Sequence, residues 1–464
     1  MNSESNQPRP SVSVIGMGYV GLCLSAGLSK FGTTVYCVDI DPAVIDQLKD
    51  GKSPIHEPML PELIRKGIQS SLLHPTKDLR EAVLNSDVSF ICVGTPCDDT
   101  GYIDLSYIKQ VSVDIGNVLK DKDKYHVVSV KSTVIPGTTD SHVIPLIEEN
   151  SGKKVGEDFG ACMTPEFLKE GDAMNDFLDP DKIVIGSFDK ASKDLMYRVW
   201  QDFTPSKLGK DVFLCCDLRT AEMIKYANNS FLATKISFIN EIANLSEIFG
   251  VDVKVVAKAM GMDQRISDQF LNAGLGFGGS CFPKDVKALY SAGNTAGYKS
   301  KLLHSVLEVN EDQPYRPVEI LKSAIKTLED KTIAVLGLAF KPNTDDVRFA
   351  PSMKVIKRLI KEGAIVQAYD PVAIDNFKTS IDVREEGKIS YFQDPKEAIA
   401  NANALIIVTE WDQLQELTIE DFTTLMKKPV IVDGRRVFDP KIFRNTKVTY
   451  KAVGFSDSKE FKPK

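Results

Sequence analysis

Residues 11–41, SVSVIGMGYVGLCLSAGLSKFGTTVYCVDID, decide the fold of the first part of the chain. Alternating β-branched residues predict a strand, an apolar helix follows the glycines, and a second β-rich run ends at Asp39. Gly16, Gly18 and Gly21 have the G-x-G-x-x-G spacing, which permits a tight turn and brings a pyrophosphate close to the helix N-terminus. The stretch predicts a βαβ unit that binds a dinucleotide, and a glycine turn that only packs a helix on a sheet is the alternative.

The acid at the end of the second strand indicates which dinucleotide is bound. The carboxylate of Asp39 can accept hydrogen bonds from a ribose diol, and it would repel a 2′-phosphate. We therefore expect NAD rather than NADP as the cofactor. Tyr19 and Val20 stand between the second and third glycines and are expected to line the same cofactor loop.

Length and composition describe an ordinary globular protein. The chain has 464 residues, of which 43% are hydrophobic and 26% charged, enough for two or three domains. A net charge of -7 gives no electrostatic reason to expect nucleic acid or an anionic membrane as a partner. The polar start MNSESNQPRP has no signal-peptide core, and no stretch stays apolar for the roughly 18 residues of a membrane span, so we expect a cytoplasmic protein. Eight cysteines without C-x-x-C spacing and five histidines without H-x-x-x-H favour neither a disulfide framework nor a metal site.

Two further β-rich runs, SDVSFICVGTP and YHVVSVKSTVIPGTT, end in small polar residues and proline. They fit later strands of one parallel sheet. Ligands bind at the carboxyl ends of such strands, so we expect Thr95 and Thr133 at the cofactor edge. Capping of the following helices is the alternative role for both threonines.

A similar α/β pattern returns near the end of the chain. KTIAVLGLAFKPNTDD predicts a strand and loop, APSMKVIKRLIKEG a helix, and AIVQAYDP the next strand. DPKEAIANANALIIVTEW echoes the earlier DLREAVLNSDVSFICVGTP, which indicates a duplicated architecture. This copy lacks G-x-G-x-x-G, and its Lys341, Arg348, Arg435 and Arg436 suit a second phosphate-bearing ligand or, alternatively, a solvated basic surface.

Between the two halves, helical apolar spacing continues over residues 218–261 and predicts a helix of more than 40 residues that joins domains. Lys225 and Asn229 are four residues apart and therefore share one face. The next stretch of note is GLGFGGSCFPKD, residues 274–285, which sets Cys281 among glycines and follows it closely with Lys284 and Asp285. A nucleophilic cysteine needs room for a substrate and nearby positive charge, whereas a packing cysteine needs neither.

These motifs together resemble the nucleotide-sugar dehydrogenases of the UDP-glucose/GDP-mannose dehydrogenase family. The likeness covers nearly the whole chain, through VIGMGYVGL, VGTP, KSTVIPGTT, TPEFLKEGDA, KYANNSFLA, DQRISDQF, GFGGSCFPKD, GLAFKPNTDDVR and VDGRRVFD. Ser280 precedes the cysteine, where the N-acetylhexosamine branch of the family has a histidine. The resemblance implies oxidation of UDP-glucose, with GDP-mannose or another nucleotide sugar as the alternative substrate, by a homodimer or higher homo-oligomer.

The resemblance also implies a role for each residue of the site. Cys281 is the implied nucleophile, with Lys225, Asn229 and Asp285 around it and with Thr133 and Glu166 positioning a water. The sugar nucleotide would meet Glu166, Phe167, Leu168, Lys225, Asn229, Arg265, Phe277, Gly278 and Lys341, with Arg265 reaching in from a neighbouring subunit. NAD would meet Gly16, Gly18, Tyr19, Val20, Gly21, Asp39, Thr95, Thr133, Glu170, Lys284 and Arg348.

The expected fold is α/β, with two Rossmann-like doubly wound domains joined by a long central helix. We expect a polar tail over residues 1–10, an NAD-binding domain over 11–205, a central helical dimerisation domain over 206–315, a UDP-binding domain over 316–455 and a polar tail over 456–464. A thiol suits a four-electron oxidation, because it can hold the aldehyde as a thiohemiacetal and then as a thioester. A two-electron hydroxyacid dehydrogenase would need neither Cys281 nor the second α/β half, and an inactive nucleotide-binding regulator would not need Lys225 or Asp285.

Overall fold

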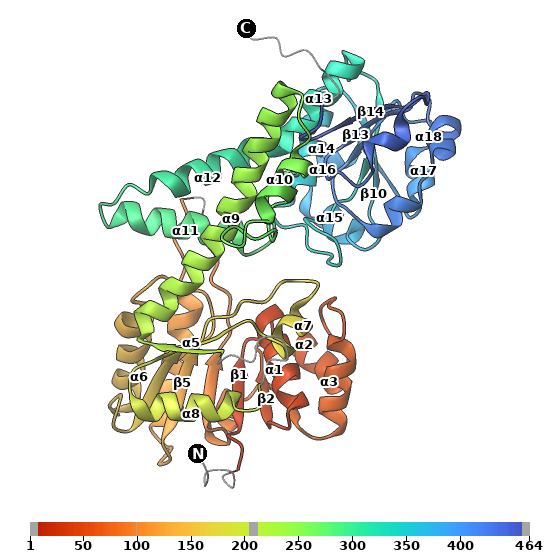
Figure 1. The fold of residues 1–464 in the computed structure, drawn as a ribbon. Coiled ribbons are helices and arrows are strands. Elements are labelled where there is room, and N and C mark those ends of the chain that lie inside the picture. The colour runs from red at the N-terminus through yellow and green to blue at the C-terminus, as the bar shows by residue number, and fades with distance from the viewer. Residues whose placement is uncertain (1–7, 99, 204–211, 457–464) are drawn as a thin grey trace. The chain divides into compact units, whose positions relative to one another are not determined.

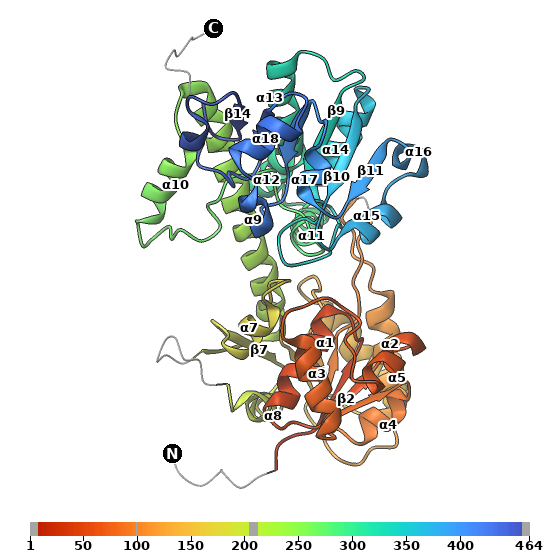
Figure 2. The ribbon, with the colours of Figure 1, turned by 90° about the vertical axis from the view of Figure 1, so that its right-hand side faces the viewer.

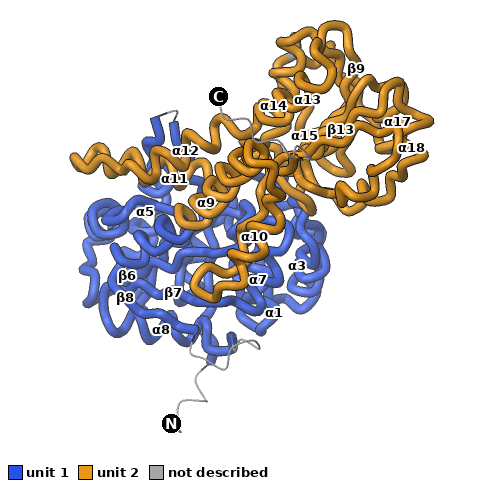
Figure 3. The backbone as a smooth tube through the Cα atoms, turned by 45° about the horizontal axis from the view of Figure 1, so that its top comes forward, with its two compact units in different colours: residues 1–228 blue, residues 229–464 orange. Residues whose placement is uncertain are grey.

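The chain contains two α/β units, residues 1–228 and 229–464 (Figure 3). In this computed structural model, residues 8–98, 100–203 and 212–456 are described. The expected fold class, two Rossmann-like doubly wound domains and a long helix between them, is confirmed (Figure 1). The long helix is α9, Leu218–Phe249, and the division into units falls inside it.

The first unit is built on an eight-stranded sheet with the order β3-β2-β1-β4-β5-β6-β7-β8. Its pairs are parallel except for β6 with β7, which are antiparallel. The strands are β1 Val12–Ile15, β2 Val35–Val38, β3 Leu73–Thr76, β4 Val88–Ile91, β5 His126–Val130, β6 Phe159–Met163, β7 Ile183–Ser187 and β8 Phe213–Cys216.

Helices cover both faces of this sheet (Figure 2). Phe90 and Ile91 are successive in β4 and belong to two different cores, as the alternation of side chains along a strand requires. In a parallel sheet covered on both faces, ligands bind at the carboxyl ends of the strands. The helices are α1 Tyr19–Lys30, α2 Pro42–Lys49, α3 Leu60–Gln69, α4 Leu79–Leu84, α5 Ser106–Leu119, the π-helix η1 Thr139–Val143, α6 Ile144–Ser151, α7 Ala173–Leu178 and α8 Lys190–Trp200.

The predicted continuous helix over residues 218–261 is wrong at one point. Helix α9 ends at Phe249, and α10, Val253–Gly261, begins after a short turn. Gly250 in this turn has φ 67°, and the side chain of Asp252 accepts a hydrogen bond from Lys254 N as the N-cap of α10. The apolar spacing continued across the break because both helices bury one face.

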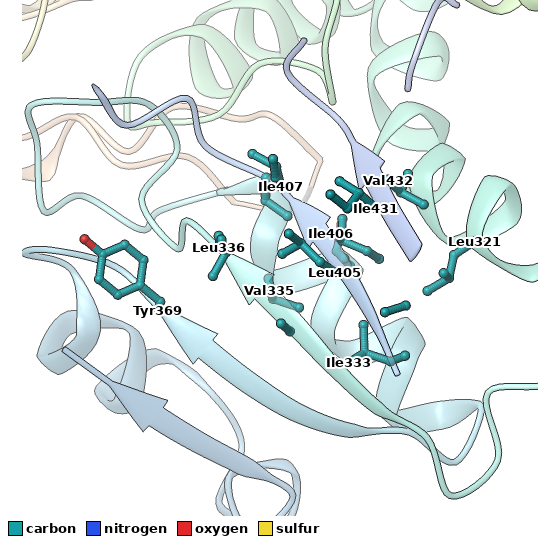
Figure 4. Packing of buried hydrophobic residues seen from close by; sticks show 14 of the residues in the cluster. Leu321, Ile333, Val335, Leu336, Tyr369, Leu405, Ile406, Ile407, Ile431 and Val432 are labelled. Atoms are coloured by element: carbon teal, nitrogen blue, oxygen red, sulfur yellow. The ribbon is translucent and has the colours of Figure 1, made fainter. Parts of the chain in front are cut away.

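The second unit has a six-stranded sheet of order β11-β10-β9-β12-β13-β14, all of whose pairs are parallel. Its core is formed by aliphatic residues of the central strands, among them Ile333, Val335, Leu405, Ile406 and Val432 (Figure 4). The strands are β9 Thr332–Leu336, β10 Ile365–Tyr369, β11 Ile389–Phe392, β12 Ala404–Ile407, β13 Val430–Asp433 and β14 Thr449–Ala452.

A helical segment precedes this sheet and carries the cysteine loop. It contains α11 Phe282–Thr295, α12 Lys301–Asp312, the 3-10 turn η2 Gln313–Tyr315 and α13 Arg316–Ile325. The strands are then connected by α14 Pro351–Lys361, α15 Ile374–Ser380, α16 Val383–Glu386, α17 Pro395–Ile399, η3 Asp412–Glu416, α18 Ile419–Leu425 and η4 Pro440–Phe443. The order β11-β10-β9-β12-β13 repeats β3-β2-β1-β4-β5, so the predicted duplication of architecture is confirmed.

Candidate functional site

The glycine loop of the first unit has the shape that a dinucleotide needs. Gly16 has φ 99°, and a Cβ there would lie 2.9 Å from the carbonyl oxygen of Cys92. A Cβ at Gly21 would lie 1.9 Å from the oxygen of Gly16. A Cβ at Gly18 would meet nothing within 4 Å, and the Gly18 N-cap makes no side-chain bond to the first turn of α1. The outer two glycines are thus required by packing within the chain, while Gly18 leaves open the helix N-terminus that a pyrophosphate uses.

Asp39 lies beside this loop and is half-buried. Its Oδ2 accepts a hydrogen bond of 2.7 Å from Met17 N, and its Oδ1 accepts one of 2.9 Å from Asp41 N. These bonds fix the carboxylate next to the glycine turn, in the place where the adenosine ribose of NAD would be bound. The residues present therefore fit NAD.

Thr95 and Thr133 are brought together at the carboxyl ends of neighbouring strands. Thr95 Oγ1 donates to the Thr133 carbonyl oxygen over 2.9 Å, which joins the loops after β4 and β5. Both threonines therefore follow the carboxyl ends of their strands, as expected, and their contact with the cofactor stays a prediction.

A buried ion pair links helix α9 to the loop after β6. Lys225 Nζ lies 2.7 Å from Glu166 Oε1, and the two side chains are 3% and 7% exposed. Burial opposes ionisation of Glu166, but the Lys225 ammonium and the Leu168 amide, which donates over 2.6 Å, outweigh it and lower the pKa of the carboxyl. The carboxylate form of Glu166 is thus favoured, and Lys225 Nζ lies beside it in a nearly dry environment.

Phe167, the residue after Glu166, carries two ammonium groups over its ring. Lys182 Nζ lies 4.3 Å and Lys225 Nζ 5.6 Å from the ring centroid. Lys182 also donates to Asn228 Oδ1 over 2.8 Å. The Phe167 ring thus lies against the side chain of Lys225, one of the residues that the resemblance places around Cys281.

Lys131 belongs to this cluster and was not singled out from the sequence. Its Nζ lies 3.4 Å from the Pro165 carbonyl oxygen and 5.0 Å from the centre of the Trp200 ring. Burial lowers the pKa of Lys131 to about 8, although Cys92 and Glu166 act against the shift. The sequence signal that could have revealed Lys131 is its position directly after the apolar strand VVSV, at a strand end.

Glu57 is a second residue that the sequence did not reveal. It is 2% exposed and accepts hydrogen bonds from the hydroxyl of Tyr19, from Gly171 N over 2.7 Å and from Ala173 N over 2.8 Å. Glu57 thus ties the first residue of α1 to the loop between β6 and α7, which also carries Glu170. No local pattern around Glu57 indicates this role.

In the second unit, Cys281 is the N-cap residue of α11. Asp285 is 1% exposed and lies one turn further, with its backbone N donating to Cys281 O over 2.8 Å. Its carboxylate accepts from Asn229 Nδ2 and from Lys284 Nζ, each over 2.7 Å. The N-terminus of a helix is the end whose dipole favours an anion, so Cys281 stands at a position of the kind that reactive thiols occupy.

The loop before Cys281 needs its glycines for close packing. A Cβ at Gly278 would lie 2.5 Å from the Phe349 oxygen, and Gly279, with φ 79°, donates its N–H to Arg348 O over 2.8 Å. Phe277 is 6% exposed and packs in a small core with Val286 and Val306. The side chain of Phe277 is therefore packed inside the second unit.

The predicted basic residues of the second unit have different environments. Arg436 is 3% exposed and makes a bidentate ion pair of 2.8 and 3.1 Å with Asp252, so it is not part of a solvated basic surface. Arg435 Nε donates to Val408 O over 2.8 Å. Arg348 pairs with Asp346 and is 61% exposed at its side chain, and Lys341 Nζ lies 5.6 Å from the Phe340 ring centre.

Arg265 lies in the segment after α10 and is 89% exposed at its side chain, where it pairs with Asp263 over 2.6 Å. Within the described ranges, no cluster of three or more His, Cys, Asp or Glu residues is placed to hold a metal ion. No helix in the same ranges is long and apolar enough to span a membrane.

Comparison with known proteins gives consistent matches over the whole chain. Models of the UDP-glucose/GDP-mannose dehydrogenase family match with the NAD binding domain at residues 10–204, the central domain at 219–312 and the UDP binding domain at 334–440. UDP-glucose 6-dehydrogenase AglM of Haloferax volcanii is 42% identical over 92% of this chain and 96% of its own. UDP-glucose 6-dehydrogenase TuaD of Bacillus subtilis is 41% identical, with 96% and 93% covered. The solved structure of a UDP-glucose dehydrogenase from Pyrobaculum islandicum superposes with a TM-score of 0.89 at 36% identity, over 98% of this chain and 100% of that one.

Proposed function

Because the chain belongs to the UDP-glucose/GDP-mannose dehydrogenase family and is an NAD-dependent nucleotide-sugar dehydrogenase, we propose that it oxidises UDP-glucose to UDP-glucuronate. The curated relatives that match over nine tenths of the chain at 41–42% identity act on UDP-glucose by name. The balanced reaction converts one primary alcohol, two NAD and one water to a carboxylate, two NADH and three protons. The alternative substrate is GDP-mannose or another nucleotide sugar.

Bound NAD would supply the hydride acceptor for both oxidations. The chain would hold its pyrophosphate at the open N-terminus of α1 beside Gly18 and its adenosine ribose at Asp39. Thr95 and Thr133, joined at the next strand ends, would bound the site on the nicotinamide side.

The role proposed for Cys281 is to keep the aldehyde covalently bound between the two oxidations. Its thiolate adds to the aldehyde carbon and forms a C–S bond, which gives a thiohemiacetal whose oxygen carries the negative charge. Loss of the second hydride from the same carbon gives a thioester. Water then adds to the thioester carbonyl, the C–S bond breaks, and the thiolate returns with the carboxylate as product.

Proton transfer and charge stabilisation are assigned to the two hydrogen-bonded sets around Asp285 and Glu166. Asp285, fixed by Asn229 and Lys284, follows Cys281 by one helical turn and would relay the proton of the thiol. The ammonium of Lys225 would stabilise the alkoxide and the later oxyanion, a contribution of roughly 3 kcal/mol for one donor. Glu166 with Thr133 would orient the hydrolytic water.

The observation that carries the proposal is Cys281 at the N-terminus of α11, with the buried carboxylate of Asp285 one turn away. A two-electron alcohol dehydrogenase has no use for this arrangement. The stoichiometry tests it directly, because two NADH should form for each UDP-glucose consumed.

Replacing Cys281 gives the sharper test. Cys281→Ser should lose turnover by about 10³-fold or more and accumulate a covalent sugar adduct, because an oxygen ester hydrolyses far less readily than a thioester. Intact-protein mass spectrometry after mixing with NAD and UDP-glucose would detect the added mass. Cys281→Ala cannot form the adduct, and Cys215→Ser, at an exposed cysteine, should turn over normally.

Three outcomes would each point to a different function. One NADH per sugar with a fully active Cys281→Ser would identify a two-electron dehydrogenase. A higher kcat/KM for GDP-mannose than for UDP-glucose would identify GDP-mannose as the substrate. Absence of any NADH with a panel of nucleotide sugars and hydroxyacids would leave a nucleotide-binding regulator.

A homodimer or higher homo-oligomer is part of the proposal. Phe231, Phe238 and Leu245 recur every seventh residue of α9 and are 65%, 45% and 43% exposed, so they form an apolar stripe along one helix face. A second copy of the chain is the partner that such a stripe suits, and the exposed Arg265 is proposed to act in the neighbouring subunit's site. A fully active monomer in dilute solution, measured by sedimentation and assay at one concentration, would contradict this.

The proposed location is the cytoplasm. The reaction requires Cys281 to remain a reduced thiol, and a reducing compartment keeps it so.

A further inference from the structure

Side-chain amides hold the glycine-rich loop before Cys281 by its backbone. The amide of Asn310, on α12, makes two bonds to one residue of the loop: Phe277 N donates to Asn310 Oδ1 over 2.7 Å, and Asn310 Nδ2 donates to Phe277 O over 3.1 Å. An amide is the side chain that can accept and donate in this paired geometry.

The start of the same loop is held in the same way. Gly274 N donates to Asn240 Oδ1 over 2.7 Å, and Gln313 Nε2 donates to Gly274 O over 2.8 Å. Asn244 Nδ2 in turn donates to Gln313 Oε1 over 2.9 Å. Asn240 and Gln313 are 0% and 2% exposed, so these bonds are made away from water, where a lost partner is costly.

The fit between Asn310 and the loop is close. Gly276 has φ 92°, and a Cβ there would lie 2.6 Å from Asn310 Oδ1. Only Gly278, Gly279 and Ser280 stand between Phe277 and Cys281, and Gly279 is itself bonded to Arg348 O. A displacement at Phe277 therefore reaches the thiol through a short and restrained segment.

We propose that Asn310 is a positioning residue, which sets the place of the Cys281 thiol by holding the backbone of Phe277. The consequence for the reaction rests on the proposed role of Cys281 as nucleophile. The consequence for the thiol itself does not, since the position of the loop determines how the sulfur sits at the N-terminus of α11.

Asn310→Asp is the variant that tests this, because it keeps the shape and the acceptor for Phe277 N while it places a carboxylate oxygen against Phe277 O. We expect kcat to fall about tenfold or more, with KM for NAD and for UDP-glucose within about threefold. The alkylation rate of Cys281 by iodoacetamide, read by peptide mass spectrometry relative to the exposed Cys215, should change by about threefold or more. Asn294→Asp, the same change at an exposed position of α11, should alter neither quantity.

Unchanged kcat and unchanged labelling of Cys281 in folded Asn310→Asp would overturn the proposal. So would a loss of thermal stability with normal labelling and normal kcat, which is the result of a merely structural bond. If Asn310→Asp does not fold, Asn310→Ser removes both bonds without adding charge and is judged by the same two readouts. If the wild type oxidises no nucleotide sugar, the proposed function fails, while the labelling rates still decide the role of Asn310.

Discussion

The two Rossmann-like units use the same turn after their first strand. Gly16 follows β1 with φ 99° and donates its N–H to Val38 O over 2.8 Å, and Gly337 follows β9 with φ 101° and donates to Tyr369 O over 2.8 Å. In both units, the next backbone N–H donates over 2.7 Å to an aspartate at the end of the second strand, Asp39 or Asp370.

The units differ in what surrounds that aspartate. Asp39 is half-buried, and α1 begins three residues after Gly16. Asp370 is 0% exposed and accepts from the backbone N–H groups of Leu338, Ala339, Val372 and Ala373 and from the indole of Trp411. In the second unit α14 starts only at Pro351, so no helix N-terminus follows the turn closely.

The comparison shows that the turn and its carboxylate do not by themselves make a dinucleotide site. The first unit leaves the carboxylate accessible and places a helix N-terminus beside it, which are the two features that NAD needs. The second unit uses the equivalent carboxylate, Asp370, to hold its own loop together. Replacing Asp39 should therefore affect NAD binding, and replacing Asp370 should affect stability.

The largest expected effect is that of Asp370→Ala on stability. Five N–H donors would lose their acceptor inside the protein, which should cost about 4 kcal/mol in the free energy of unfolding of the second unit. Urea denaturation followed by hydrogen exchange would locate the loss in β9 and β10. Binding of NAD by the folded protein should not change. A loss below about 1 kcal/mol would mean that Asp370 does not stabilise the second unit as its hydrogen bonds indicate.

The two units are also expected to differ in how much stability they lose at low pH. His126 in β5 is fully buried between Ser89 and Ser86, and burial, with the nearby Lys122, lowers its pKa to about 3. Between pH 6.5 and 3 the unfolded chain binds a proton that the folded chain does not, so the stability of the first unit is lost as pH falls through this window. We expect a loss of about 2 kcal/mol at pH 5.

The second unit supplies the internal control for acid. Its sole histidine in the sequence, His304, is half exposed at its side chain and pairs with Glu308. Hydrogen exchange at pH 7 and pH 5, corrected for intrinsic rates, should show weakened protection in β1, β4 and β5 and little change in β9 and β12. Equal weakening in both sheets would remove His126 as the cause.

The smallest effect on stability is expected at Asp39. Asp39→Ala should raise KM for NAD about tenfold, because it removes the acceptor for the ribose diol, and should narrow the preference for NAD over NADP. The free energy of unfolding should change by less than about 1 kcal/mol. Asp375→Ala, at a 98% exposed carboxylate, is the matched control. It should change neither the KM for NAD nor the preference for NAD over NADP. An unaltered ratio of kcat/KM for the two cofactors would contradict the assignment of Asp39.

Much of the fold was predictable because apolar periodicity and glycine spacing are local signals. The strand-turn-helix at Gly16, the strand ends at Thr95 and Thr133 and the repeat of the architecture were all read from short stretches. The break at Gly250 was not, because one glycine does not interrupt apolar spacing. The antiparallel pairing of β6 with β7 depends on the path of the connection through α7, and that path has no local signature in the sequence.

The site was predictable to the extent that chemistry requires an unusual residue in an unusual place. Cys281 among glycines and Asp39 at a strand end are such cases. Glu57 and Asn310 act through backbone groups far away in the sequence, so only the folded chain reveals their partners. For Arg436 the sequence suggested a contact that the structure does not show. Its place in a basic motif indicated a phosphate-bearing ligand, whereas its guanidinium pairs with Asp252 of the same chain.

The bond between Tyr19 and Glu57 sets a limit on protein engineering. Tyr19 begins the helix of the cofactor loop. Through Glu57 it is tied to Gly171, on the loop that also carries Glu166, and to Ala173, the first residue of α7. A cofactor loop transplanted from another dehydrogenase would reproduce the three glycines and lose this tie unless it brought a tyrosine at the same position. Exchange of cofactor specificity in this enzyme is therefore best attempted at Asp39 and Ile40, which lie outside the tie, with residues 16–21 left as they are.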